Sequence, residues 1–354
     1  MSFIFHNPVR IEFGCEAGPA LERLAGNRAA AIITCRSLAD SAAVKKLAAG
    51  NRRVFAVSGG ADVFELEKLY GAVHSQPVEV IIAIGGGSAI DAAKILSAPP
   101  EGGAAAAFAR QRALWLEGKP FSARRLPVLA APATAGSGSD VTPWAVVWDK
   151  AAGRKYSLES QSLWPQASVC DPELALSMPR DAALHSGLDA LAHALEALWS
   201  KNANPVSDTL AFAAAKGALE SLPAALREPP GIEPRTQMML AALRAGLAFS
   251  NTRTGMAHAL SYYLTLKRGV PHGLACGVML PLVAGAAEDK DKIAEFGAEK
   301  LSQFTARLGV PSLRDLGVSR SDLADMRRCG AESGRGQNSA INETRLWELV
   351  DEQL

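Results

Sequence analysis

The residues best suited to chemistry are one aspartate and three histidines that fall in two segments of the chain. Asp189 and His193 lie four residues apart in GLDALAHALEA, whose helical spacing places both side chains on one face, one turn apart. His258 lies in a second helical pattern, and His272 stands between a proline and a glycine. Three neutral imidazoles and one carboxylate form a ligand set for Fe(II), Zn(II), Co(II) or Mn(II), with a position left open for a substrate oxygen.

Taken singly, each of these histidines is more often a hydrogen-bonded core or surface residue than a metal ligand. The other histidines, His6, His74 and His185, have no partner at ligand spacing and are expected to be structural, although His185 lies four residues before Asp189. The four residues predict a metal centre only in combination with nucleotide-binding signals earlier in the chain.

A glycine-rich turn supplies the first of these signals. In VEVIIAIGGGSAIDAAK, the apolar run before the turn predicts a buried strand and the residues after it predict a helix. Gly86, Gly87 and Ser88 allow backbone N–H groups and a helix N-terminus to approach a pyrophosphate closely. Asp91 and Lys94 lie on the first turns of that helix. Asp91 is a further coenzyme candidate, and surface solvation is the alternative for Asp91 and the expectation for Lys94. The turn does not satisfy the strict GxGxxG fingerprint, so a plain strand-to-helix connection remains the other interpretation.

A second glycine-containing loop, PATAGSGSD, follows another apolar run. The hydroxyls of Thr134, Ser137 and Ser139 are suited to bonding amide, ribose or phosphate oxygens. In open α/β sheets, ligands bind at the carboxyl ends of the strands, so the two loops are expected to serve one nucleotide.

The remaining pattern predicts the elements that position these residues. Four short apolar runs predict strands of a parallel sheet: Ala29–Thr34, Val54–Val57, Val80–Ile84 and Leu126–Ala131. The segment from Pro99 to Arg125 predicts a helix flanked by loops. After Pro172 the spacing becomes helical, in Ala182–Ser200, Ser207–Leu222, Arg235–Asn251 and Asp289–Leu308. We therefore predict a Rossmann-like α/β dinucleotide-binding domain over residues 1–172 and an all-α metal-binding and substrate domain over residues 173–354.

Composition narrows the class of partner. The 354 residues carry a formal charge of +1, which provides no field to attract nucleic acid or an anionic membrane, so a small ligand is expected. The five cysteines are scattered, with no CxxC pair, which argues against a disulfide framework and a thiolate zinc site and favours a reducing compartment. The first residues lack the pattern of a signal peptide, and no apolar run reaches about 18 residues. These features predict a cytoplasmic protein.

Four motifs carry a resemblance to a known family: AIGGGSAIDAAK, PATAGSGSDVT, DPEL…SMP with GLDALAHALEA, and AGLAFSN followed by His258 and PHG. Over nearly its full length the chain resembles the iron-containing (group III) alcohol dehydrogenases, which share the dehydroquinate synthase-like architecture. The resemblance implies NAD or NADP as coenzyme, with the GGGS turn at the pyrophosphate and the second loop at the nicotinamide. It implies iron or another divalent metal, held by Asp189, His193, His258 and His272, and a homodimer.

Two departures from the family pattern bear on function. Many family members carry a further histidine one turn after the third ligand, where this chain has Tyr262, so Tyr262 is a catalytic candidate with different proton handling. Many NAD-preferring members have an aspartate after the first strand, where this chain has Arg36. Arg36 can pair with a 2′-phosphate, which favours NADP(H); the alternative interpretation is that it only solvates a loop.

A narrower resemblance concerns the substrate. The segments VTPWAVVWD, KYSLES, ALWSKNANPVSD and AFSNTRTGMAHALSYYLT resemble the phosphonoacetaldehyde reductase branch of the family. This resemblance implies reduction of phosphonoacetaldehyde to 2-hydroxyethylphosphonate. An anionic substrate needs fixed cations, for which Lys201, Arg253 and either Lys267 or Arg268 are the candidates.

Two other functions fit the same plan. One is a lyase of the dehydroquinate synthase type, which would need several basic residues around a polyol phosphate, whereas Trp144, Trp148 and Tyr262 suit a small aldehyde better. The other is a nucleotide- or metal-binding relative without turnover, for which Tyr262 is the only hint. For an aldehyde reductase, the metal would act as a Lewis acid on the carbonyl oxygen while the nicotinamide donates hydride.

Overall fold

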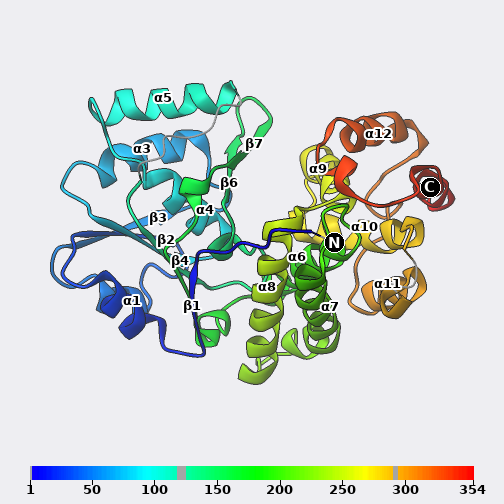
Figure 1. The fold of residues 1–354 in the computed structure, drawn as a ribbon, viewed down its shortest axis with the longest axis horizontal. Coiled ribbons are helices and arrows are strands. Elements are labelled where there is room, and N and C mark those ends of the chain that lie inside the picture. The colour runs from blue at the N-terminus through cyan, green and yellow to red at the C-terminus, as the bar shows by residue number, and fades with distance from the viewer. Residues whose placement is uncertain (1, 118–124, 290–293) are drawn as a thin grey trace. The chain divides into compact units, whose positions relative to one another are not determined.

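The computed structural model describes residues 2–117, 125–289 and 294–354, which form two compact units. The sheet unit contains Asn7–Thr134 and Ser139–Ser177 (Figure 1). The helical unit contains Met178–Leu354 together with two short pieces, Met1–His6 and Ala135–Gly138. The middle of the second glycine-containing loop therefore groups with the helical unit, although the sequence around it belongs to the sheet unit.

The sheet unit is built on a parallel sheet, six-stranded in the part of the chain that is described, with strand order β1-β8-β5-β4-β2-β3. Its strands are β1 (Arg10–Phe13), β2 (Ala30–Cys35), β3 (Arg52–Val57), β4 (Val80–Gly85), β5 (Val128–Pro132) and β8 (Ala167–Cys170). Its helices are α1 (Ala17–Ala25), α2 (Ala42–Leu47), α3 (Val63–Val73), α4 (Gly87–Leu96) and α5 (Ala104–Leu116). Three 3-10 turns complete it: Ser139–Val141, Gln161–Leu163 and Pro172–Ala175.

Apolar residues cover both faces of this sheet, which explains why its central strands are continuous apolar runs. Alternate residues of β4 belong to two separate cores: Ile81 and Ala83 pack with α3, α4 and α5, whereas Val80 and Ile82 pack with α1 and α2. The sheet is thus the middle of three layers, and the residues after its strands lie at its carboxyl edge.

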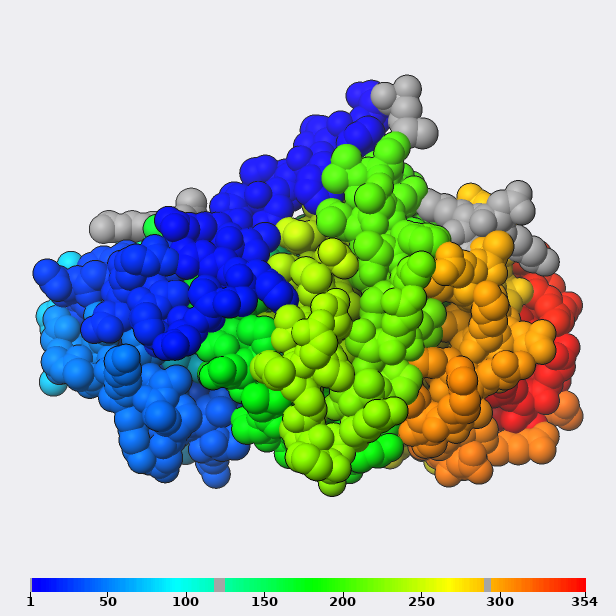
Figure 2. Space-filling view, turned by 90° about the horizontal axis from the view of Figure 1, so that it is seen from below, coloured from blue at the N-terminus to red at the C-terminus, as the bar shows by residue number. Residues whose placement is uncertain are grey.

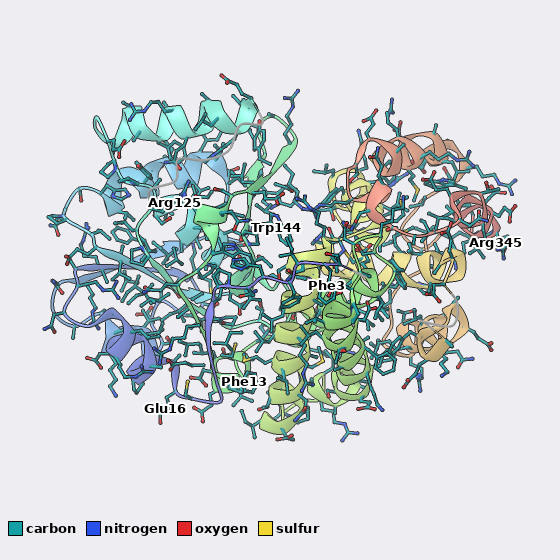
Figure 3. The ribbon with its side chains drawn as sticks, in the orientation of Figure 1. Phe3, Phe13, Glu16, Arg125, Trp144 and Arg345 are labelled. Carbon is teal, nitrogen blue, oxygen red and sulfur yellow. The ribbon has the colours of Figure 1, made fainter. Side chains whose placement is uncertain are left out.

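A buried lysine anchors α4 to the segment that follows the second loop. Lys94, which the sequence suggested as a solvated residue, is fully buried, and its Nζ donates to the carbonyl oxygens of Thr142 at 2.8 Å and Trp144 at 2.6 Å. Trp144, labelled in Figure 3, begins β6 (Trp144–Asp149), which pairs with β7 (Arg154–Glu159) in an antiparallel hairpin. Asp91 and Asp140 are the buried carboxylates that interact with this ammonium.

The helical unit contains α6 (Arg180–Leu198), α7 (Pro205–Ala225), α8 (Ile232–Thr252), α9 (Met256–Arg268), α10 (His272–Ala286), α11 (Ala298–Arg307), α12 (Leu323–Glu332) and α13 (Glu343–Glu352). Its 3-10 turns are Ala294–Phe296, Arg320–Asp322 and Gly336–Asn338. Helices α7 and α8 lie side by side, as the space-filling view in Figure 2 shows. Asn204 and Ser207 form a capping box at the start of α7, and Gly269, with φ of 68°, ends α9 in the left-handed conformation.

The predicted fold class is confirmed: a parallel α/β part is followed by a helical part. Each predicted strand is present within two residues at either end, and the helix expected between Pro99 and Arg125 is α5. The prediction over Asp289–Leu308 was too long, because Gly297 separates a 3-10 turn from α11, and residues 290–293 of that range lie outside the described part. Strands β1, β6, β7 and β8 were not predicted. β1 and β8 have only four residues each, and β7 is largely polar.

Among the described residues, no helix combines the length and apolar character that a membrane crossing requires. Cytoplasmic location and the homodimer stay predictions.

We expect Lys94→Met to destabilise the protein by about 3–5 kcal/mol, because it leaves two carbonyl oxygens and the Asp91 carboxylate buried without their cation. Denaturant unfolding measures the change, with Lys68→Met on the exposed side of α3 as the matched control. Equal midpoints for Lys94→Met and the wild type would contradict the anchoring role of Lys94.

The pH dependence of stability gives a second test of the role of Lys94. Burial lowers the pKa of Lys94 from 10.5 to about 8, so between these values the unfolded chain binds more protons at this residue than the folded chain. Wild-type stability therefore gains a contribution as the pH rises through this window, and Lys94→Met lacks it. The stability deficit of the variant should grow from about pH 8 to about pH 10.

Candidate functional site

Helix α6 carries the polar residues of the site within a buried segment. From Gly187 to Leu198 every residue is buried, and most are alanine or leucine. Asp189, His193 and Glu196 are the polar exceptions, spaced four and three residues apart on one face. A polar group in such surroundings costs free energy unless it has a partner, so these side chains must be satisfied by each other, by neighbouring helices or by a bound ion.

Each of the three predicted histidine ligands has its Nδ1 engaged by an oxygen. His193 Nδ1 lies 3.3 Å from the carbonyl oxygen of Gly136, which only accepts, and His258 Nδ1 lies 2.5 Å from Glu196 Oε2. His272 Nδ1 lies 3.2 Å from the Ser261 hydroxyl, whose own proton goes to the carbonyl oxygen of His258. These contacts place a proton on Nδ1 in all three rings, which leaves Nε2 as the atom that can bind a metal.

The three Nε2 atoms converge on one carboxylate oxygen. Asp189 Oδ1 lies 3.4 Å from His258 Nε2, 3.9 Å from His272 Nε2 and 4.0 Å from His193 Nε2. Among the described side chains, Asp189 Oδ1 and His258 Nε2 are buried without a hydrogen-bond partner. Ligands about 2.1 Å from a shared ion lie roughly 3–3.5 Å apart, so this spacing is that of a metal centre slightly expanded. The orphaned atoms are the ones that an ion would satisfy.

Electrostatics keep His193 and Asp189 in the form that binds metal. Burial lowers the pKa of His193 to about 4, so its imidazole is neutral at physiological pH. Burial alone would raise the pKa of Asp189, but the surrounding imidazoles of His193, His258 and His272 hold it below its ordinary value. A neutral imidazole beside an ionised carboxylate matches what a divalent cation requires.

Close packing of two helices makes the convergence possible. His272 is the first residue of α10, and Gly273 follows it directly against α6. A Cβ at Gly273 would lie 1.9 Å from the carbonyl oxygen of His185 and 3.1 Å from Asp189 Cβ, so only glycine permits this approach. On the opposite side of the site, the Phe249 ring of α8 stacks on His193 with ring centroids 4.0 Å apart.

In the sheet unit, the structure brings together most of the predicted coenzyme residues. Gly86 is the N-cap of α4, and no side chain in the described part caps this helix. A Cβ at Gly86 would meet Thr134 Cγ2 at 3.1 Å, so the two glycine loops touch at this point. Ser88 Oγ accepts from the backbone N–H of Gly60 at 3.1 Å. A glycine turn with exposed N–H groups at a helix start is suited to a pyrophosphate.

The other coenzyme candidates take different positions. Asp91 is buried and accepts from Ser139 Oγ and from the backbone N–H of Val146. These contacts hold the end of the second glycine-containing loop, and the Asp91 carboxylate does not face an open surface. Arg36 is exposed directly after β2, the neighbour of β4 in the sheet. Ser137 belongs to the piece Ala135–Gly138 of the helical unit, next to the carbonyl that His193 contacts.

The residues that the sequence suggested for substrate contact have different surroundings in the structure. Tyr262 stacks on His272 with centroids 5.8 Å apart and planes 11° apart. Lys201 and Arg253 are exposed, whereas Arg268 forms a bidentate pair with Asp322 at 2.7 and 2.8 Å and is thereby committed to structure. Trp144 and Trp148 lie on β6 in the sheet unit, where Trp148 packs against Gly60 and Lys155.

Comparison with known proteins identifies the family to which this chain belongs. The iron-containing alcohol dehydrogenase profile matches residues 8–172, and the profile of the C-terminal part of the Fe-containing alcohol dehydrogenase family matches residues 183–293. An alcohol dehydrogenase of Thermococcus barophilus is 32% identical over 292 residues, which cover 81% of this chain and 70% of that protein. The chain belongs to the iron-containing alcohol dehydrogenase family.

Two proteins similar to this chain are named as reductases of phosphonoacetaldehyde and of sulfoacetaldehyde. Phosphonoacetaldehyde reductase of Streptomyces viridochromogenes is 38% identical over 57% of this chain and 51% of its own length. The crystal structure of sulfoacetaldehyde reductase from Bifidobacterium kashiwanohense in complex with NAD+ superposes with a TM-score of 0.89 and 29% identity over 100% of this chain and 99% of that one. Against several other curated relatives, the match spans only 24% to 50% of their length.

The sequence analysis did not identify two further candidate functional residues, Glu196 and Cys276. Glu196 is fully buried and, besides His258 Nδ1, accepts from the backbone N–H groups of Gly255 at 2.8 Å and His258 at 3.1 Å. Cys276 is fully buried one turn after His272, and its Sγ lies within 4.8 Å of donor atoms of Asp189, His258 and His272. Burial raises the pKa of this thiol. The spacings Asp189-x3-His193-x2-Glu196 and His272-x3-Cys276 were the available signals, since both follow one helix face.

We expect Glu196→Gln to weaken metal binding by about 10- to 100-fold, because the amide removes the charged acceptor that orients His258. Competition with a chromophoric chelator for Co(II) or Zn(II) measures the affinity without any need for catalysis. Glu220→Gln, on an exposed position of α7, is the matched control. If Glu196→Gln binds the metal as tightly as the wild type, Glu196 does not position the ligand.

Proposed function

We propose that this chain is a divalent-metal-dependent oxidoreductase that interconverts small aldehydes and alcohols with NADP(H) or NAD(H). The observation that carries the proposal is the convergence of three Nε2 atoms on the Asp189 carboxylate. Asp189, His193, His258 and His272 are the proposed ligands. Fe(II) is the metal that the family name implies, and Zn(II) or another divalent ion suits the same donors.

The proposed coenzyme site lies in the sheet unit. The Gly86-Gly87-Ser88 turn would hold the pyrophosphate at the start of α4, with Thr134 against the same turn. Ser137, Ser139 and Asp91 remain candidates for supporting the loop that serves the nicotinamide. Arg36, at the end of the strand beside β4, is the proposed partner of a 2′-phosphate.

In the proposed mechanism, a divalent metal supplies Lewis acidity to the carbonyl oxygen and the coenzyme supplies the hydride. The chain holds the reacting groups in place. Glu196 fixes the His258 ring through Nδ1, and Phe249 lies flat on His193, so the ligands need little rearrangement during the reaction. Tyr262, parallel to His272, is the proposed group that delivers a proton to the substrate oxygen.

The proposed substrate is a short aldehyde with an anionic head, with phosphonoacetaldehyde as the first choice and 2-hydroxyethylphosphonate as its product. Support comes from the two relatives whose names specify phosphonoacetaldehyde and sulfoacetaldehyde.

We expect protein reconstituted anaerobically with Fe(II) to oxidise NADPH when phosphonoacetaldehyde is added, and His258→Ala to lose at least about 10–100-fold of this activity. Absorbance of the reduced coenzyme measures the rate. His6→Ala, an exposed histidine outside the metal centre, is the matched control. No coenzyme consumption with any aldehyde would contradict the proposal and favour a lyase or a protein without turnover.

We expect Arg36→Ala to lower kcat/KM for NADPH by about 10- to 100-fold, because it removes a charged hydrogen-bond donor from the 2′-phosphate. The value for NADH, which has no such phosphate, should stay within about 3-fold. Steady-state kinetics with both coenzymes measure the ratio. Parallel losses for the two coenzymes would show that Arg36 does not select between them.

A further inference from the structure

Asn338 bonds to three segments of the helical unit, and each of these segments carries a basic residue. The segments are the turn after α6 with Lys201, the connection between α8 and α9 with Arg253, and the last 3-10 turn with Arg335. Asn338 is 8% exposed, so it acts from inside the protein while the charged side chains stand further out.

The backbone of each segment is fixed by this one residue. The N–H of Asn338 donates to the carbonyl oxygen of Arg335 at 3.1 Å, and the N–H of Lys201 donates to the carbonyl oxygen of Asn338 at 2.8 Å. Asn338 Nδ2 donates to the carbonyl oxygens of Thr252 at 2.8 Å and Thr254 at 3.1 Å, on either side of Arg253. Three backbone segments that carry basic residues are therefore held together, and here Lys201 Nζ donates to the carbonyl oxygen of Gln337 at 2.7 Å.

Arg335 connects this basic cluster to the metal centre. Its guanidinium carbon lies 5.3 Å from the centroid of the Tyr262 ring, and that ring stacks on His272. The side chain of His272 is 30% exposed, against 13% for Asp189, 7% for His193 and 1% for His258. The metal centre thus opens on the side of His272, which is the side where Tyr262 and Arg335 lie.

We propose that Arg335 is a specificity-determining residue that binds the anionic head of the aldehyde, with Lys201 and Arg253 contributing charge around it. The inference rests on the proposed function and adds the anion subsite to it. In a two-carbon aldehyde with a phosphonate or sulfonate, the anion lies within about 5 Å of the carbonyl oxygen. With its carbonyl oxygen at the metal centre, such a substrate would direct its anion to the side of His272, where Tyr262 and Arg335 lie.

The chemistry of the guanidinium suits this role. Its planar array of donors matches a tetrahedral oxyanion in a bidentate manner. The Tyr262 ring holds the guanidinium by a cation–π contact, which limits the freedom that binding would otherwise remove. An uncharged aldehyde gains nothing from this contact, so Arg335 should affect selectivity rather than turnover of small neutral substrates.

The experiment compares kcat/KM of the metal-loaded enzyme for phosphonoacetaldehyde, sulfoacetaldehyde and propanal in the wild type, Arg335→Gln and Arg335→Lys. We expect Arg335→Gln to lose about 10- to 100-fold with the anionic aldehydes, mainly through KM, and to stay within about 3-fold with propanal. Arg335→Lys should retain part of the preference, since it keeps the charge without the planar fork. The relative losses for the two anionic aldehydes distinguish a phosphonate site from a sulfonate site.

Arg327→Gln is the matched control, because Arg327 also lies over an aromatic ring, that of Trp347 at 5.2 Å, on α12 rather than beside the metal centre. Circular dichroism melting of each variant separates loss of folding from loss of the subsite. Equal effects of Arg335→Gln on phosphonoacetaldehyde and propanal would overturn the inference.

Calorimetric titration with phosphonoacetate, a non-reducible analogue, tests the subsite independently of turnover. We expect Arg335→Gln to weaken its binding to the metal-loaded protein by the same 10- to 100-fold or so. Unchanged binding would overturn the inference even if the enzyme reduces aldehydes. If no aldehyde is reduced, the proposed function fails, and the titration still decides whether Arg335 holds the anion.

Discussion

A single buried carboxylate, that of Glu196, fixes the arrangement on which the metal centre depends. It is fully buried on α6, and a charge in that position is tolerated only with complete compensation. Burial alone would raise its pKa, but His258 and the N–H groups at the start of α9 hold the pKa of Glu196 below its usual value. The same contacts set the position of α9 against α6, the proton of His258 on Nδ1 and the direction of its Nε2.

The end of the chain contributes to the same arrangement. Ser339 Oγ accepts from the N–H of Met256, so the start of α9 is capped both by Glu196 and by a residue more than 80 positions further on. The adjacent Asn338 holds the turns that carry the basic residues. The C-terminal part of the helical unit thus does more than cover the core: it fixes the helix that carries His258 and Tyr262.

The parallel sheet and the long helices could be predicted from the sequence because they depend on local periodicity. The four proposed ligands could be predicted because aspartate and histidine side chains at this spacing are typical of metal sites. Strand β4 is apolar throughout and β2 is apolar except for Thr34, and Asp189 and His193 share a helix face. The same reasoning missed Glu196, Cys276 and Asn338, whose roles arise from contacts between distant segments. It also treated Lys94 as a solvated residue, since nothing local indicates that two carbonyl oxygens and two carboxylates surround it.

The unequal exposure of the ligands has a consequence for how the metal is kept. His258 is almost entirely enclosed and His193 nearly so, whereas His272 stands at the first position of a helix and meets solvent. In the proposed site, the ion and the substrate would therefore share one route, past the ligand whose departure disturbs the core least. A substrate lying across His272 would block the route by which the ion leaves. Metal retention and substrate occupancy would in this way be linked, and the enzyme without substrate would be the form most open to chelators and to oxidants.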